Sequence, residues 1–449
     1  MTADPATDRA AADAVLDIAL EESKSKADET EVILTSQNLA LSRITHNVIH
    51  ENLIERDRSI NIRVVVQNRV GVASTNELDR EGIRTAVARA IEIARVSPAD
   101  EEFPGLPSSG PATHAMDWAY DEPTAALTPA ARAAAVADIV KVMVAHKLTA
   151  AGYVSTSSGS VAIANTKGIK QFFRSTDSAI NIKAMGDDSS GYAEGYARRF
   201  SDLNAAKLGE TAASRAAAGR NPGSVEPGEY TVILEPPAFR EYLGYLSWTG
   251  FGAMPFSEGS SFMTGRIGDR LMGNNITIGD DFAHPSGAGM PFDFEGVPRQ
   301  PVTLIDKGVA SGVVYDSYYA AKLKHANTGH ALPAPNTYGP LPLNIVLTPG
   351  TKSADDLIRE TKRGLLVCRT WYIRLVDKLQ TIITGMTRDG FFLIEDGQIV
   401  RGLKNMRFNE SIVGALGRCE LAKDLVRSES HVLPACRIDG FRFSSGTTF

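Results

Sequence analysis

The sequence is poor in three features that would assign a chain to a specialised class. Its 449 residues hold only three cysteines, Cys368, Cys419 and Cys436. This odd, widely spaced set argues against a disulfide framework and favours a reducing cytoplasm. The net charge of −6 provides no basic surface for nucleic acid or an anionic membrane. No apolar run approaches the roughly 18 residues that a membrane-spanning helix needs, so we expect neither a nucleic acid nor a membrane partner.

The N-terminus also lacks the basic and apolar segments of a signal peptide. The remaining composition, 43% hydrophobic and 22% charged residues, is that of an ordinary globular protein. Stretches rich in proline, glycine and serine divide the chain. They predict an N-terminal α+β module over residues 1–97, a linker over 98–129, a second α+β module over 130–220 and a β-rich domain over 229–449.

Hydrophobic periodicity predicts an α+β fold. Each module should contain a helix, an antiparallel sheet and a closing helix, and the C-terminal domain should form a barrel-like sheet. The strands are predicted to be short and separated by polar turns, for example 31–36 and 39–45, or 170–175 and 179–184. The motif D-x-x-I-N-I-basic occurs at Asp57–Arg63 and at Asp177–Lys183. It indicates either an internal duplication or convergent strand composition.

The most informative stretch is residues 230–281. A β-branched run is followed by Pro236 and Pro237, which are tolerated where a helix begins. The predicted helix carries the sequence Arg240-Glu241-Tyr242-Leu243-Gly244-Tyr245. Zinc peptidases place two histidines and a general-base glutamate on such a helix as H-E-x-x-x-H. Here Arg240 and Tyr245 stand at the histidine positions, and a guanidinium cannot bind a metal. Taken alone, the segment is also typical of an ordinary amphipathic helix.

Two longer runs downstream are more specific than this helix: EGSSFMTGRIGDRLMGNNITIGDD and GLLVCRTWYIRLVDKLQTIITGMTRDGFFLIEDGQIVRGLKNMRF. Both runs resemble the TldD/PmbA family of two-subunit peptidases. In that family, one subunit type carries H-E-x-x-x-H and a cysteine as zinc ligands, and the TldE/PmbA type lacks them. The resemblance implies a TldE/PmbA-like subunit that binds no metal and has no catalytic residue, with degenerate positions Arg240, Glu241 and Tyr245. It also implies a heterodimer with a zinc-binding TldD-type partner, acting on unfolded peptides.

Other candidate sites are weaker. Thr387, Arg388 and Asp389 interrupt two apolar strands, either as a lip of the substrate groove, with Arg388 available to a peptide carboxylate, or as an ordinary hairpin turn. His46 and His50 lie on a predicted strand, where residues four apart are roughly 13 Å from each other, so they should not share a metal. His431 and Cys436 are expected to pack within the fold rather than to bind a metal. The glycine-rich run 186–195 is expected to form turns between strands.

Two alternative functions remain open. The chain is compatible with a metal-free homodimer that binds peptides. It is also compatible with an amide hydrolase subunit that acts in the maturation of a peptide or natural product.

Overall fold

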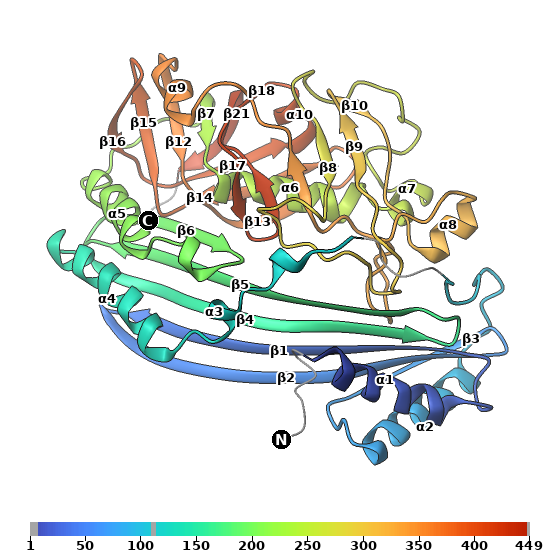
Figure 1. Ribbon diagram of the computed structural model, residues 1–449. Coiled ribbons are helices and arrows are strands. Elements are labelled where there is room, and N and C mark those ends of the chain that lie inside the picture. The colour runs from blue at the N-terminus through green and yellow to red at the C-terminus, as the bar shows by residue number, and fades with distance from the viewer. Residues whose placement is uncertain (1–7, 109–113, 447–449) are drawn as a thin grey trace.

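The computed structural model describes residues 8–108 and 114–446. Its N-terminal half is built around one antiparallel sheet with the strand order β3-β2-β1-β4-β5-β6. Four very long strands cross the molecule as a curved layer, with the C-terminal half stacked above it (Figure 1). The six strands are β1 (Glu29–Thr45), β2 (Val48–Val66), β3 (Arg69–Thr75), β4 (Thr149–Asn165), β5 (Lys170–Met185) and β6 (Ser190–Ala197).

The prediction of short strands separated by turns is wrong for this sheet. Gln37, in the polar centre of β1, pairs with Asp57 of β2 on one side and with Gly159 of β4 on the other. A residue paired on both sides continues a strand, whatever its polarity. The polar segments therefore mark the middle of long strands, and each predicted pair of short strands merges into one.

The two modules repeat each other and share the sheet. Each contains a helix, three strands and a helix in that order. Strands β1 and β4 are both 17 residues long and begin at positions 29 and 149. The shared motif also occupies equivalent register positions in the two modules: Asp57 of β2 pairs with Gln37 of β1, and Asp177 of β5 pairs with Ser157 of β4. The topology therefore supports an internal duplication.

Four helices cover the sheet face that points away from the C-terminal half. Val32 and Leu34 of β1 pack in the core formed with α1 and α2, whereas Ile33 between them packs against Phe292 of the C-terminal half. This alternation is what a strand buried on both faces requires. The helices are α1 (Arg9–Ser23) and α2 (Arg80–Val96) in the first module and α4 (Pro129–Ala145) and α5 (Ala205–Ala218) in the second; the short α3 (Glu122–Ala125) connects the modules.

The C-terminal half contains two sheets around the helix α6 (Pro236–Gly250). One sheet comprises β7 (Gly228–Leu234), β12 (Arg363–Val367), β13 (Thr370–Asp377), β14 (Ile382–Thr387), β15 (Phe391–Glu395), β16 (Gln398–Gly402), β17 (Met406–Ser411), β18 (Cys419–Leu421) and β21 (Cys436–Gly446). The other comprises β8 (Ile278–Asp280), β9 (Val302–Asp306), β10 (Val309–Ala310), β11 (Ile345–Leu347), β19 (Val426–Ser428) and β20 (His431–Leu433). Short helices border them: α7 (Ala253–Ser257), α8 (Ser317–Leu323), α9 (Ala354–Arg359) and α10 (Ile412–Leu416).

The predicted α+β class is confirmed, but the barrel is not. In the described part of the chain, the larger sheet runs from β13 to β16 without closing, and the smaller runs from β10 to β19. Phe239, Tyr242 and Leu243 of α6 share one core with residues of both sheets. Because α6 covers the apolar faces of both sheets, neither needs to close on itself.

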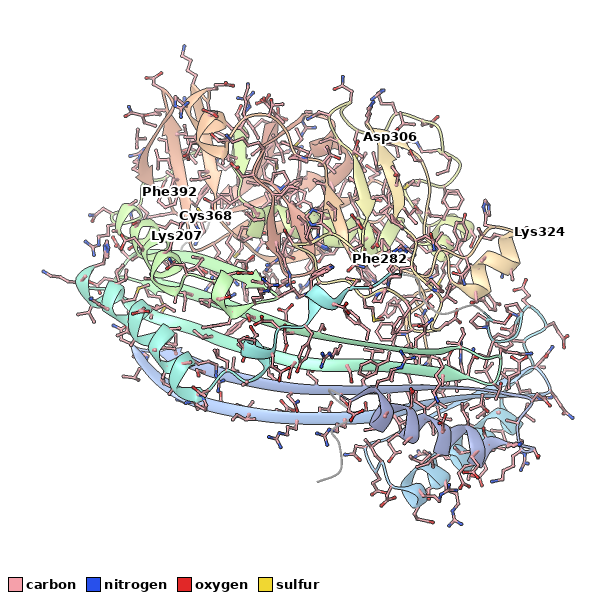
Figure 2. The ribbon with its side chains drawn as sticks, viewed as in Figure 1. Lys207, Phe282, Asp306, Lys324, Cys368 and Phe392 are labelled. Atoms are coloured by element: carbon pink, nitrogen blue, oxygen red, sulfur yellow. The ribbon has the colours of Figure 1, made fainter. Side chains whose placement is uncertain are left out.

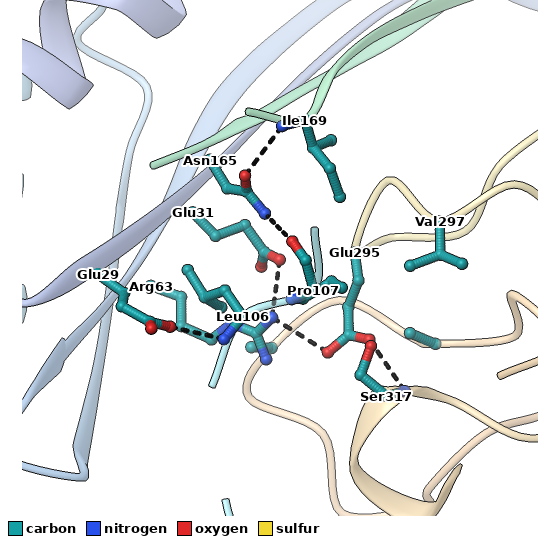
Figure 3. Close-up of polar contacts among 12 residues, drawn as sticks. Glu29, Glu31, Arg63, Leu106, Pro107, Asn165, Ile169, Glu295, Val297 and Ser317 are labelled. Carbon is teal, nitrogen blue, oxygen red and sulfur yellow. Dashed lines mark hydrogen bonds and ion pairs between the residues drawn. The ribbon is translucent and has the colours of Figure 1, made fainter. Parts of the chain in front are cut away.

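Buried contacts join the C-terminal half to the long sheet. The Arg63 guanidinium of β2 lies 2.7 Å from Glu31 of β1 and 3.1 Å from Glu295 of the C-terminal half (Figure 3). The backbone N–H of Ser317 donates to the other carboxylate oxygen of Glu295. Phe282 lies at the same junction between the two layers (Figure 2), in a small core with Met116 and Ala119. Across the described ranges, no helix is both long and apolar enough to cross a membrane.

Candidate functional site

Helix α6 presents the degenerate motif at the junction of the two halves. It follows β7 directly, and Pro236 and Pro237 occupy its first turn, where no backbone N–H needs a partner. Phe239, Tyr242 and Leu246 are fully buried in the core. The opposite part of the helix, with Arg240, contacts β6 and the hairpin β19–β20. The sequence prediction of a helix here is correct, and the burial of one face fixes which residues reach the junction.

Arg240 sits among three carboxylates. Its Nη1 atom lies 2.8 and 2.9 Å from the two carboxylate oxygens of Glu194 and donates to Ser428 at 3.0 Å. Glu429 is 3.2 Å and Glu241 is 3.4 Å from other guanidinium nitrogens. The side chains of Arg240 and Glu194 are only 11% and 4% exposed. Burial disfavours the charged guanidinium, but the carboxylates outweigh it and raise the pKa of Arg240 above its usual value.

Glu194 comes from β6, a strand that was not predicted from the sequence. The run 186–195 was expected to form turns, yet Ser190–Ala197 is a strand. A Cβ added to Gly191 would lie 2.1 Å from a backbone oxygen of α5, so the side chains on this face of β6 must be small. The opposite face carries Tyr192, whose hydroxyl donates to Glu194 at 2.6 Å. The alternation of small and large residues in SGYAEGYA is the signal that would have predicted this strand.

The two other motif positions have separate surroundings. Burial raises the pKa of Glu241, while Arg240 opposes the shift. The hydroxyl of Tyr245 donates to the backbone oxygen of Ile373 in β13 at 3.0 Å. Arg240 is thus held against β6 and Tyr245 against β13. A zinc ion does not fit, because the site already contains a cation and a neutral phenol at the two ligand positions. Among residues 8–108 and 114–446, no group of three or more His, Cys, Asp or Glu side chains is arranged to hold a metal.

The candidate His and Cys side chains belong to different elements: His431 to β20, Cys436 to β21 and His50 to β2. A Cβ on Gly244 would lie 3.9 Å from the Nε2 atom of His431, so His431 borders the motif helix. Burial and the nearby Arg240 charge lower the pKa of His431 to about 4, which leaves its imidazole neutral. Cys436 is fully buried in β21. His46 lies at the turn after β1 and His50 within β2.

Thr387, Arg388 and Asp389 lie at the end of β14, close to the second module. Thr387 is buried and accepts a hydrogen bond from the backbone N–H of Met406. Asp389 is buried between Lys183 at 3.0 Å and Arg369 at 2.9 Å. Arg388 is the most exposed of the three, at 36% of its side chain, and its guanidinium lies 5.5 Å from the centre of the Trp371 ring. Their assignment to a substrate groove stays a prediction.

A cavity of about 500 Å³ lies between the long sheet and the C-terminal half. Its sheet side is formed by the polar strand centres, and its other side by Arg299, Asn344 and Ser430 among others. The polar interruptions of the long strands therefore line a space between the two layers. Sheet residues that border it are Thr35, Ser36, Gln37, Ser157, Ser158, Gly159, Ser160, Val161, Phe173 and Ser175.

Comparison with known proteins identifies the family. Three family models match consecutive parts of the chain: PmbA/TldA metallopeptidase domain 1 at residues 31–94, the central domain at 119–220 and the C-terminal domain at 227–445. The chain belongs to the PmbA/TldD metallopeptidase family. Metalloprotease PmbA of Escherichia coli O157:H7 is 28% identical over 330 residues, which cover 70% of this chain and 71% of that protein.

Solved structures of similar fold cover almost the whole chain. TldE from Thermococcus kodakarensis matches with a TM-score of 0.87 at 19% identity, covering 96% of this chain and all of that one. A protein from Thermotoga maritima described as a putative modulator of a DNA gyrase matches with a TM-score of 0.86 at 18% identity, covering 96% of this chain and 100% of that one. The resemblance to this family that the sequence motifs indicated is therefore confirmed, together with the fold.

Proposed function

We propose that this chain is the TldE/PmbA-type subunit of a two-subunit zinc metallopeptidase. Arg240 carries the proposal, because it places a buried guanidinium at a zinc-ligand position of the motif. Its guanidinium supplies to Glu194, Glu241 and Glu429 the positive charge that a metal ion would otherwise supply. Zinc and the hydrolytic chemistry would then reside in a TldD-type partner. Three buried thiols suit a cytoplasmic location for the pair.

The substrate in this proposal is an unfolded peptide. The 500 Å³ cavity offers serine, threonine and amide groups from the strand centres, which suit the hydrogen-bonding groups of an extended peptide backbone. Thr387, Arg388 and Asp389 would lie on the margin of the chamber. Within that segment Arg388 has the exposure needed to contact substrate, whereas Asp389 anchors Lys183 and Arg369.

The edge of the larger sheet is the surface we assign to the partner. Strand β13 ends the strand order of that sheet in the described residues. Trp371, Tyr372 and Val376 are exposed along it, and the Arg374 guanidinium stacks on Tyr372 at 4.4 Å. An exposed edge strand with large apolar side chains favours association with another chain. Tyr245 links this edge to the motif helix, so a partner here would sit beside the degenerate site.

The test is a pull-down of the tagged chain at its native expression level, with mass spectrometry of the co-purifying proteins. The proposal predicts an H-E-x-x-x-H protein in equal amount and zinc in that protein. Recovery of this chain alone, as a homodimer, would overturn the two-subunit assignment.

A further inference from the structure

A second pocket lies beside the degenerate site and is lined by three arginines. Its volume is about 430 Å³, and its walls include Trp118, Tyr196, Arg198, Arg199 and Arg427. It is next to the Arg240 cluster in two ways. Tyr196 stands two positions from Glu194 on β6 and thus on the same face of that strand. Arg427 directly precedes Ser428, which bonds Arg240.

Arg198 is a buried cation without a carboxylate at hydrogen-bond distance. Its guanidinium donates to three backbone oxygens, those of Gly287 at 3.2 Å, Gly289 at 2.8 Å and Thr176 at 3.4 Å. The indole ring of Trp118 lies 5.9 Å from it. These neutral partners fix the position of the guanidinium but carry no charge to balance it, so among the described residues only the Asp177 carboxylate, which acts at longer range, opposes its charge.

Arg427 is the second buried cation. One of its terminal nitrogens bonds Asp177 at 2.5 Å, and its Nε atom donates to the backbone oxygen of Glu429 at 2.7 Å. Its other terminal nitrogen, Nη1, has no hydrogen-bond partner in the described structure. The side chain is only 6% exposed. A guanidinium with an unused, solvent-shielded donor is prepared for an acceptor that arrives with a ligand.

The charges around the pocket indicate which anion it would take. Arg198 and Arg427 share a single carboxylate, that of Asp177, so the buried part has a surplus of about one positive charge. Burial and the neighbouring Arg427 lower the pKa of Arg198 to about 10, as expected for two cations held together. Arg199 and Asp202 add a charge of each sign at the pocket wall. Asp121 lies 3.8 Å from Arg199 and offsets part of its charge. A singly charged carboxylate matches this surplus better than a phosphate dianion.

We infer that this arginine pocket, formed by Trp118, Tyr196, Arg198, Arg199 and Arg427, binds a carboxylate group of a peptide held in the neighbouring 500 Å³ cavity. The two spaces adjoin at Gly289, which lines the cavity and accepts a hydrogen bond from Arg198. The carboxylate belongs to an Asp or Glu side chain or to the peptide C-terminus. The inference rests on the proposed function, because it assumes a peptide ligand. It adds a preference for acidic peptides, which the degenerate motif alone does not imply.

The experiment measures peptide affinity by fluorescence anisotropy, using the full chain with the partner that co-purifies. Three labelled peptides are identical except at a few positions and at the C-terminus. The first has glutamates at those positions and an amidated C-terminus, the second has glutamines and an amidated C-terminus, and the third has glutamines and a free C-terminal carboxylate. We expect either carboxylate-bearing peptide to bind roughly tenfold more tightly than the neutral one. Inorganic phosphate and acetate serve as competitors.

Variants locate the effect. Arg427→Gln should abolish most of the preference, and the more exposed Arg199→Gln should reduce it by roughly twofold or more. Arg266→Gln removes an exposed arginine outside the pocket and should leave the preference unchanged. Arg199→Gln keeps the test decisive if Arg427→Gln fails to fold.

Four results would overturn the inference. Equal affinity for the carboxylate-bearing and neutral peptides, or an unchanged preference in both pocket variants, would remove the carboxylate site and leave the proposed function intact. Stronger competition by phosphate than by acetate at equal charge concentration would assign the pocket to another class of anion. Failure of every peptide to bind would overturn the proposed function together with the inference.

Discussion

The Nη1 atom of Arg240 lies 2.8 Å from the Oε1 atom of Glu194. This contact joins the motif helix of the C-terminal half to the edge strand of the long sheet, so it ties the degenerate site to the packing of the two layers. A cation fixed in this way contributes to stability and leaves no open coordination position.

Glu194→Gln should destabilise the protein by about 3 kcal/mol, because it leaves Arg240 buried with a weaker partner. The free energy of unfolding in urea measures the effect. Glu429→Gln is the matched control: Glu429 contacts the same guanidinium but is 58% exposed, so its loss should cost less than about 1 kcal/mol. Equal costs for the two substitutions would show that burial of the Glu194 pair is unimportant.

The double variant Arg240→His, Tyr245→His should acquire zinc. It removes the cation, places two imidazoles at the motif positions and leaves Glu241, Glu194 and the neutral imidazole of His431 nearby. We expect about one zinc per chain by elemental analysis. The control Arg240→Gln, Tyr245→Phe lacks the imidazoles and should stay zinc-free. A zinc-free histidine variant would contradict the correspondence of these two positions with zinc ligands.

Stability should depend on pH through the buried carboxyl of Glu31, which pairs with Arg63 at the junction of the layers. Burial raises the pKa of Glu31 from 4.5 to about 7, against the opposing effect of Arg63. The folded protein therefore holds this proton more tightly than the unfolded chain. The contribution is fully present below about pH 4.5 and is lost as the pH rises through 7, by on the order of 2 to 3 kcal/mol.

Urea denaturation at a series of pH values tests this sign. Glu31→Gln cannot ionise, so its stability relative to the parent chain should increase from pH 4.5 to 7. Glu21→Gln changes an exposed carboxylate and should follow the parent curve. A stability difference between Glu31→Gln and the parent that stays constant over this range would refute the assignment.

The partner surface is tested by changing the exposed aromatic residues of β13. Trp371→Ser with Tyr372→Ser should reduce recovery of the partner in the pull-down by tenfold or more, because aromatic residues dominate the energy of protein interfaces. The unfolding midpoint should change little, since both side chains are about half exposed. Val144→Ser removes an exposed apolar side chain of α4 and is the control. Undiminished recovery from the double variant would place the partner elsewhere.

Local sequence signals predicted α6 and its motif correctly, because Pro236, Pro237 and the spacing of Phe239 and Leu243 are short-range features. They failed where long-range pairing decides. Gln37 and Asp57 are polar enough to suggest turns, yet each is held in a strand by its neighbours. The resemblance of whole motifs identified the family correctly, whereas periodicity gave the α+β class but neither the long shared sheet nor the open C-terminal sheets.

The partners of Arg240 could not be predicted from the sequence, because they too depend on long-range contacts. Glu194 is 46 positions away and Ser428 is 188 away, so no spacing rule connects them. Glu194 was also hidden in a glycine-rich run, where the glycines serve close packing of β6 on α5. Substitution of both histidine positions indicated the loss of a metal site, but only the structure showed the three carboxylates that surround the replacement.

The most direct test of the central claim is the zinc content of the isolated wild-type chain after equilibration with zinc and removal of excess ion. We predict no stoichiometric zinc, because Arg240 occupies the ligand position within its carboxylate cluster. One tightly held zinc per chain, lost on substitution of Glu241 or His431, would contradict it and would make this subunit a metal-binding one.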